Sequence, residues 1–215
     1  MFGAMYVVAD RAAYLADATT YLEAQPLPIE DAMLKVRRPR KTWTMDDLAS
    51  SLDELDRRRS YSNGKHMFEV ANCAGCHRMD DAGAEFGPDL MKLDPKLQRA
   101  EILRDRLEPS ARINEKYSSY TFLTKTGRVV NGLVVGETKD TIKVVENPLA
   151  KTESLDLKLA DIARRTKSPT SIMPNGLLDR LTREEILDLL AYVEARGDRN
   201  AKVFQRECGH VPASR

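Results

Sequence analysis

The apolar positions of this chain follow a helical period in both outer parts and a strand-like period in the middle. Residues 5–25 and 29–36 each repeat apolar side chains at helical spacing, and a pair of prolines separates them. Thr44 is a suitable N-cap, and the acidic residues that follow it favour the first turn of a helix. The apolar stripe of that helix is Leu48, Leu52 and Leu55. The first 59 residues are therefore expected to form a helical extension.

Two further helices are expected before the middle part. Polar residues at 60–63 supply caps for a helix over 64–70, in which Gly64 and Phe68 lie four residues apart on one face. A glycine at this place would let another helix approach closely. The spacing of apolar residues over 96–107 predicts the second of these helices.

The last predicted helix begins after Thr182, which acts as N-cap with Glu185 three residues later. Its apolar residues share one face, and Gly197 is a good C-cap. The tail over 198–215 is polar.

The middle of the chain alternates in the manner of strands. Turn residues separate short runs that are rich in β-branched and aromatic side chains. Gly132 and Gly136 fall inside a strand and suit the tight bending of a small sheet. The expected strands form a β meander over 117–124, 128–137, 141–146, 152–157 and 162–166.

The stretch Cys73-Ala74-Gly75-Cys76-His77 carries the chemistry. Two thiols three residues apart, followed at once by histidine, are the attachment signature of a c-type haem: both sulfurs form thioethers, and the His77 ring ligates the iron. A zinc site would need more ligands, and the only other cysteine, Cys208, lies far along the chain. A thioredoxin-like pair would normally follow a strand, whereas the segment before Cys73 is predicted to be helical.

Two residues outside this motif are expected to contribute to the same site. Phe68, on the helix that leads to the motif, would pack beside the porphyrin. Pro88 has a fixed backbone and no N–H, so its carbonyl oxygen is well placed to accept a hydrogen bond from the ring nitrogen of His77 that does not ligate iron.

Composition adds several limits. The formal net charge of +1 favours neither nucleic acid nor a membrane surface as partner, and no apolar run approaches the ~20 residues of a membrane span. Cys208 has no partner for a disulfide within the monomer, and an incidental or buried thiol explains it better than a ligand. The first residues do not resemble a signal peptide. Because haem is normally attached outside the cytoplasm, we expect this chain to be a fragment or the C-terminal part of a longer exported protein.

Together these motifs resemble a class I cytochrome c. The resemblance rests on Gly64 and Phe68, the Cys73 to His77 motif, Gly87-Pro88-Asp89-Leu90, a methionine in a loop before the final helix, and Tyr192 in that helix. The segments 108–120 and 171–178 and the β meander are similar to the planctomycete-type haem-binding domain. In that family a β insertion interrupts the cytochrome c core, which lies at the C-terminal end of large exported proteins, often behind dehydrogenase-like or helical-repeat regions.

The resemblance covers about residues 60–197 and implies a mainly α fold. In that fold, a cytochrome c-like helical core is interrupted by a small antiparallel β-sheet, and a helical extension precedes it. The expected parts are the N-terminal extension over 1–59, the core over 60–116 and 167–197, the β insertion over 117–166 and the tail over 198–215.

The resemblance places the sixth iron ligand at Met173, in the loop before the last helix. Histidine ligation by His66 or His210 and an open sixth position remain alternatives. The other methionines near the motif are better explained by packing: Met67, Met79 and Met91.

The leading hypothesis is a one-electron carrier that holds one covalent haem c. Its partner would be a redox protein or a fused dehydrogenase domain, in the periplasm or an equivalent exported compartment. The sequence contains no constellation that supports independent catalysis. The alternative is a haem enzyme or gas sensor of the peroxidase kind, with a displaceable sixth ligand. A third hypothesis makes the β meander a docking module, against the simpler one that it covers part of the haem or packs on the core.

Overall fold

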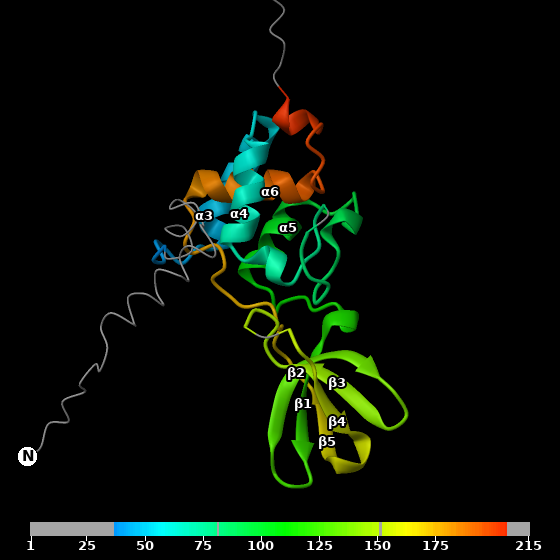
Figure 1. The fold of residues 1–215 in the computed structure, drawn as a ribbon. Helices are drawn as coiled ribbons and strands as arrows, with labels where there is room; N and C mark the ends of the chain where they lie inside the picture. The colour runs from blue at the N-terminus through cyan, green and yellow to red at the C-terminus, as the bar shows by residue number, and fades with distance from the viewer. Residues whose placement is uncertain (1–36, 81, 151, 206–215) are drawn as a thin grey trace, which may run out of the picture. The chain divides into compact units, whose positions relative to one another are not determined.

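A computed structural model describes residues 37–80, 82–150 and 152–205 (Figure 1). The helices predicted over 5–25 and 29–36 lie outside these residues, as do Cys208 and His210. The helices of the described part are α3 (Met45–Leu48), α4 (Tyr61–Val70), α5 (Arg99–Leu107) and α6 (Arg183–Glu194). Short 3₁₀ helices cover Ala49–Asp56, Cys73–Gly75, Leu90–Lys92, Glu115–Tyr117, Leu159–Asp161 and Lys202–Phe204.

The helix predicted after Thr44 forms only in part. The hydroxyl of Thr44 accepts from the backbone of Asp47, and the Asp47 carboxylate accepts from the backbone of Thr44, which completes a capping box. The helix tightens to 3₁₀ geometry at Ala49, where serine and aspartate residues are weak helix formers. The predicted apolar stripe is buried nevertheless: Leu48, Leu52 and Leu55.

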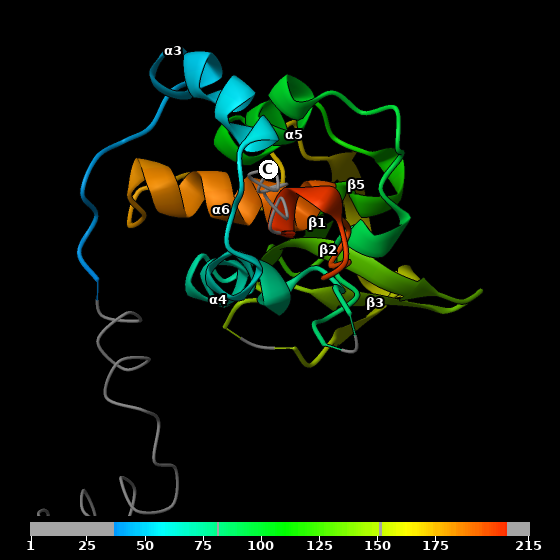
Figure 2. The ribbon, with the colours of Figure 1, turned by 90° about the horizontal axis from the view of Figure 1, so that it is seen from above.

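The helical part is built on the crossing of α4 and α6. Figure 2 shows α4 nearly end-on beside α6, so the two helices cross steeply. A Cβ atom at Gly64 would lie 2.3 Å from the carbonyl oxygen of Asp188 and 2.8 Å from Cβ of Tyr192. The predicted close approach at Gly64 is therefore confirmed. Helix α4 begins at Tyr61, three residues earlier than predicted, because Ser60 caps it.

A buried carboxylate locks the start of α4 to α6. Asp188 accepts hydrogen bonds from Nε of Arg59 at 2.8 Å, the backbone N–H of Ser60 at 3.1 Å and Nδ2 of Asn63 at 2.8 Å. These bonds compensate the burial of its charge. The start of the last helix was predicted accurately, since Thr182 and Glu185 form the expected capping box of α6. The helix ends earlier than predicted, with Ala195 and not Gly197 as its C-cap.

The predicted meander is a five-stranded antiparallel sheet with the order β4-β3-β2-β1-β5. Its small core is separate from the helical core and contains Phe122, Val130, Ile142, Val144 and Leu157. Gly132 is required because a Cβ there would lie 2.4 Å from the carbonyl oxygen of Val145. The β2–β3 register shifts between Val134 and Gly136, which fits the expected bending. The strands are β1 (Ser119–Thr124), β2 (Val129–Glu137), β3 (Thr141–Val145), β4 (Leu155–Lys158) and β5 (Ile162–Lys167).

The mainly α fold class was wrong. Of the described residues, 35% are helical and 19% are in strands or bridges, so helices and one five-stranded sheet both form large parts of the fold. The sequence explains why the sheet forms so large a part of the fold. The helices between the motif and the sheet are short, whereas the strand pattern continues over some fifty residues, and the strands form their own core.

Gly64→Ala should destabilise the protein by about 1–3 kcal/mol, because the added methyl group overlaps the backbone of Asp188. The sign of the change in stability is informative, because helix propensity by itself would make alanine more stable than glycine by about 1 kcal/mol. Chemical denaturation measures the loss. The matched control is Gly136→Ala, where the new Cβ would lie 3.5 Å from the Lys143 side chain and should change the free energy of unfolding by less than about 0.5 kcal/mol. Equal effects of both changes would contradict the helix crossing.

Candidate functional site

The two cysteines lie on a tight turn directly after α4. Asn72 adopts a left-handed conformation with φ of 57° and ends the helix, and a 3₁₀ turn follows over Cys73–Gly75. The backbone N–H groups of Cys76 and His77 both donate to the carbonyl of Cys73, at 3.1 and 2.9 Å. Both cysteine side chains are buried and neither forms a disulfide. One turn therefore holds both sulfurs, as attachment to a single porphyrin edge requires.

The loop after the motif folds back onto this turn. The backbone N–H of Ala84 donates to Ala74 at 3.0 Å, and that of Gly87 donates to Cys76 at 2.8 Å. Gly83 has φ of 100°, which allows the chain to reverse. A Cβ at Gly87 would lie 2.7 Å from Cε1 of His77, so only glycine lets the loop pass so close to the ring.

The His77 ring is fixed by the hydrogen bond that the sequence predicted. Nδ1 of His77 lies 2.8 Å from the carbonyl oxygen of Pro88. A carbonyl only accepts, so Nδ1 carries the proton and Nε2 keeps its lone pair for a metal. Burial lowers the pKa of His77, which further favours the neutral ring.

The protonation of the thiols argues against two alternatives. Burial raises the pKa of Cys73 to about 11 and also raises that of Cys76. A redox pair or a zinc ligand needs a thiolate, which positive surroundings favour and burial opposes. Within the described ranges, no group of three or more His, Cys, Asp or Glu side chains could hold a metal ion.

Phe68 lies in the helical core and packs edge-on against Tyr192, with ring centroids 5.8 Å apart. Contact between Phe68 and a porphyrin remains a prediction. The hydroxyl of Tyr192 also donates to Asp80 at 2.9 Å, and Tyr61 and Lys65 both lie 3.4 Å from the same carboxylate oxygen. Sequence reasoning missed Asp80, which ties the loop after the motif to α4 and α6.

Met173 lies half-buried in the loop before α6. Its backbone N–H donates to Oγ of Ser171, and the backbone N–H of Ser171 donates to Oγ of Ser110, each at 3.1 Å. These bonds hold the loop to the segment after α5. Ligation by Met173 remains a prediction.

The competing ligands differ in their surroundings. Met67 and Met79 are each 2% exposed and belong to the helical core, which fits packing. Met91 is 43% exposed. His66 lies half-buried on α4, the helix that precedes the motif.

The loop after β3 touches the motif. A Cβ at Gly75, between the two cysteines, would lie 2.7 Å from Cδ2 of Leu149. Leu149 belongs to the loop after β3, where Oδ1 of Asn147 accepts from the Leu149 backbone at 3.1 Å. Leu149 therefore packs against the attachment turn at Gly75.

Sequence reasoning also missed Arg106, which is buried on α5. The helical period could have found it, because Arg106 is four residues after buried Ile102 and three after buried Leu103. A charged residue on a buried face indicates a specific partner.

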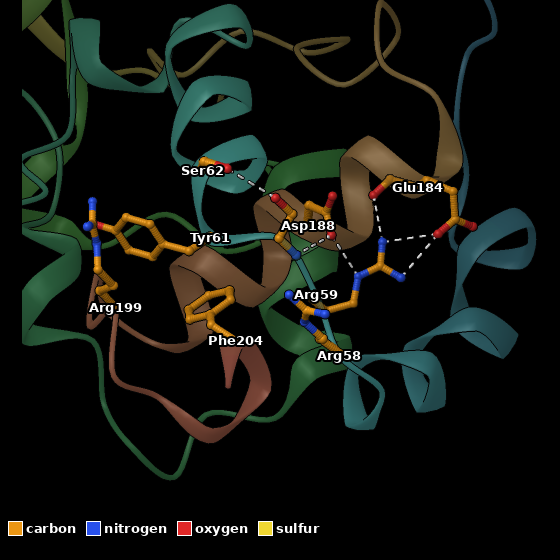
Figure 3. Close-up of a pocket in the computed structure, with 9 residues that line it drawn as sticks. Arg58, Arg59, Tyr61, Ser62, Glu184, Asp188, Arg199 and Phe204 are labelled. Atoms are coloured by element: carbon orange, nitrogen blue, oxygen red, sulfur yellow. Dashed lines mark hydrogen bonds and ion pairs between the residues drawn. The ribbon is translucent and has the colours of Figure 1, made fainter. Parts of the chain in front are cut away.

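A surface hollow of about 690 Å³ at the start of α4 includes none of the predicted site residues (Figure 3). Its main charges satisfy one another, since Arg59 pairs with Glu184 at 3.1 Å and with Asp188 at 2.8 Å. Arg199 lies 4.9 Å from the centre of the Tyr61 ring. This hollow is better explained by the joining of α4 to α6 than by a ligand.

The residues present fit a covalently attached haem. Two sulfurs lie on one turn, the histidine after them keeps Nε2 available, and Pro88 holds its other nitrogen. None of the helices in the described part has the length and apolarity needed to cross a bilayer.

Comparison with family models agrees with this fit, whereas no curated protein matches the chain. Residues 61–133 match the family model for cytochrome c, and this segment contains α4, the cysteine turn, α5 and β1. The match ends before Met173 and α6. Residues 61–133 are thus similar to cytochrome c, a family whose cofactor is covalently bound haem c.

Proposed function

We propose that this chain is a one-electron carrier in which Cys73 and Cys76 hold one haem and His77 is the proximal ligand. The observation that carries the proposal is the 2.8 Å hydrogen bond from His77 to Pro88 beside a turn that holds both thiols. The cytochrome c match of residues 61–133 supports it. Haem c supplies an iron that gains and loses one electron.

In this proposal the residues of the chain hold the cofactor, orient its ligand and exclude water. Cys73 and Cys76 tether the cofactor, and Pro88 fixes the orientation of the His77 ring. The buried helical cluster around Phe68 excludes water from the cofactor, which lowers the reorganisation that electron transfer requires. None of these tasks needs a bound substrate.

Met173 is proposed as the second axial ligand. Its loop is anchored to Ser110, and the buried methionines of the core serve packing instead. A thioether ligand raises the reduction potential relative to a second histidine. Such a potential favours accepting electrons from a dehydrogenase that oxidises an organic substrate. The partner is therefore proposed to be a dehydrogenase-type protein or a domain fused to this one.

The finer family assignment and the compartment are part of the same proposal. The order of motifs around the β insertion supports a planctomycete-type haem-binding domain, and covalent haem attachment supports an exported, periplasmic or equivalent location. The five-stranded sheet and the contact between Leu149 and Gly75 support an insertion that covers the core.

Met173→Ala should remove the far-red absorption band of methionine-ligated ferric haem and lower the reduction potential, while the mass still includes one haem. Visible spectroscopy, potentiometry and mass spectrometry of protein matured in a competent host measure these three properties. Met91→Ala is the control, because that side chain is 43% exposed. An unchanged spectrum in Met173→Ala would exclude this ligand and direct attention to His66 and His210.

Carbon monoxide distinguishes the carrier from a haem enzyme or sensor. The reduced protein should show no spectral change under carbon monoxide, because both axial positions are occupied by side chains. Met173→Ala should bind the gas readily. Binding by the unaltered protein at a similar level would refute the carrier and favour the peroxidase or sensor alternative.

A further inference from the structure

The segment over 40–43, directly before α3, is bonded to the end of the loop that leads into α6. Figure 2 shows this segment passing the start of α6 on its way to α3. The backbone N–H of Arg40 donates to the carbonyl oxygen of Asp179 at 2.7 Å, and that of Trp43 donates to Oδ1 of Asp179 at 3.3 Å. Nε1 of Trp43 donates to the carbonyl oxygen of Leu181 at 3.1 Å. Two segments that are distant in the sequence are joined by these bonds.

The side chain of Trp43 is held on several sides. Trp43 is the only tryptophan of the chain, and its ring is partly buried against the helical core cluster. Nζ of Lys41 lies 4.9 Å from the centre of the ring and also pairs with Asp47 in α3. The cation, the core and the carbonyl acceptor together restrict the orientation of the indole. Its bond to Leu181 therefore fixes the backbone at that place.

The loop between Met173 and Leu181 contains a tight turn. The backbone N–H of Asp179 donates to the carbonyl oxygen of Gly176 at 3.1 Å, and that of Leu181 donates to Leu178 at 2.9 Å. Gly176 has φ of 75°, and a Cβ there would lie 3.0 Å from Oδ2 of Asp179. The carboxylate that accepts from Trp43 thus lies against a turn that begins three residues after Met173.

Met173 lies between two anchors of this loop. On one side, the backbone N–H of Ser171 donates to Oγ of Ser110 at 3.1 Å. On the other side, Asp179 is bonded to the segment of Trp43. A segment that is fixed at both ends has less backbone freedom, so less conformational entropy is lost when a side chain within it binds a metal.

We propose that Trp43 is a positioning residue that holds the loop of Met173 in the conformation in which its thioether binds the haem iron. The inference rests on the proposed function, because it needs Met173 as the sixth ligand. Trp43 acts through the backbone of 179–181 rather than on the iron itself. By linkage, ligation by Met173 stabilises the contact of Trp43 by the same factor by which that contact stabilises ligation.

Trp43→Ala should weaken ligation by Met173 without removing the haem. Imidazole competes with the thioether for ferric iron, and the imidazole concentration that removes half of the far-red band measures this competition. In Trp43→Ala that concentration should fall about tenfold, because a hydrogen bond and the packing of the ring are lost at one anchor. Trp43→Phe keeps a ring and loses the indole N–H, so the fall should be about threefold.

The matched control is Leu97→Ala. Leu97 is likewise partly buried against the helical core cluster, and its backbone N–H donates to Asp94 within its own turn at 3.0 Å. Loss of this side chain weakens the same core and leaves both anchors of the loop, so the imidazole concentration should change by less than about twofold. Equal concentrations in both variants would overturn the proposal.

A second measurement uses the unaltered protein and therefore does not depend on the folding of a variant. Hydrogen exchange of the Trp43 indole N–H, followed by NMR, should accelerate about tenfold when imidazole displaces Met173, because the two contacts stabilise each other. Exchange of the backbone amides of the sheet should stay the same. An indole exchange rate that does not respond to imidazole would refute the role of Trp43.

Failure of the proposed function gives different results. A chain whose mass includes no haem refutes haem attachment. A haem protein without the far-red band refutes ligation by Met173, and the inference fails with it. A far-red band that resists imidazole equally with and without Trp43 refutes the role of this residue alone.

Discussion

The close approach of α4 and α6 at Gly64 is the constraint on which the site depends. Helix α4 ends directly at the cysteine turn, and α6 follows the loop that contains Met173. The crossing therefore fixes the place where the cysteine turn starts and the place where the Met173 loop ends. Only a residue without a side chain permits it, because a Cβ at Gly64 would overlap the carbonyl oxygen of Asp188. The bonds of Asp188 to the start of α4 then prevent the helices from sliding.

Two carboxylates mark where this packing is specific. Asp188 is satisfied by three donors from 59–63, and Asp80 accepts from Tyr192 across the same pair of helices. Both carboxylates are thus compensated by the protein itself. Arg106 differs, since among the described residues its side chain donates to a carbonyl of its own helix, that of Ile102. Within one core, the two carboxylates join segments that are distant in the sequence, whereas the buried arginine is bonded within its own helix.

Local signals in the sequence predicted most of the longer helices and strands that the structure describes, although the mainly α fold class was wrong. The capping box at Thr182, the glycine at position 64 and the strands around Gly132 depend on neighbours a few residues away or on a single backbone requirement. The bond from Pro88 to His77 was also predictable, because proline restricts its own backbone. Asp80 was not, since its partners Tyr61 and Tyr192 come from two helices that only the fold brings together. The contribution of the sheet to the fold class was underestimated, because the predicted strands were treated as a small insertion in a helical core.

The loop after β3 lies against the turn that holds the two cysteines. Leu149 contacts Gly75 between the two cysteines, and that side of the turn is therefore covered by the protein itself. Electron transfer needs a short path from the porphyrin edge to the partner. Under the proposed function, a partner would either approach an edge that this loop leaves open or bind the loop as part of its surface. The covering and docking hypotheses are then compatible, because a loop that covers one face also forms the border of the face that remains.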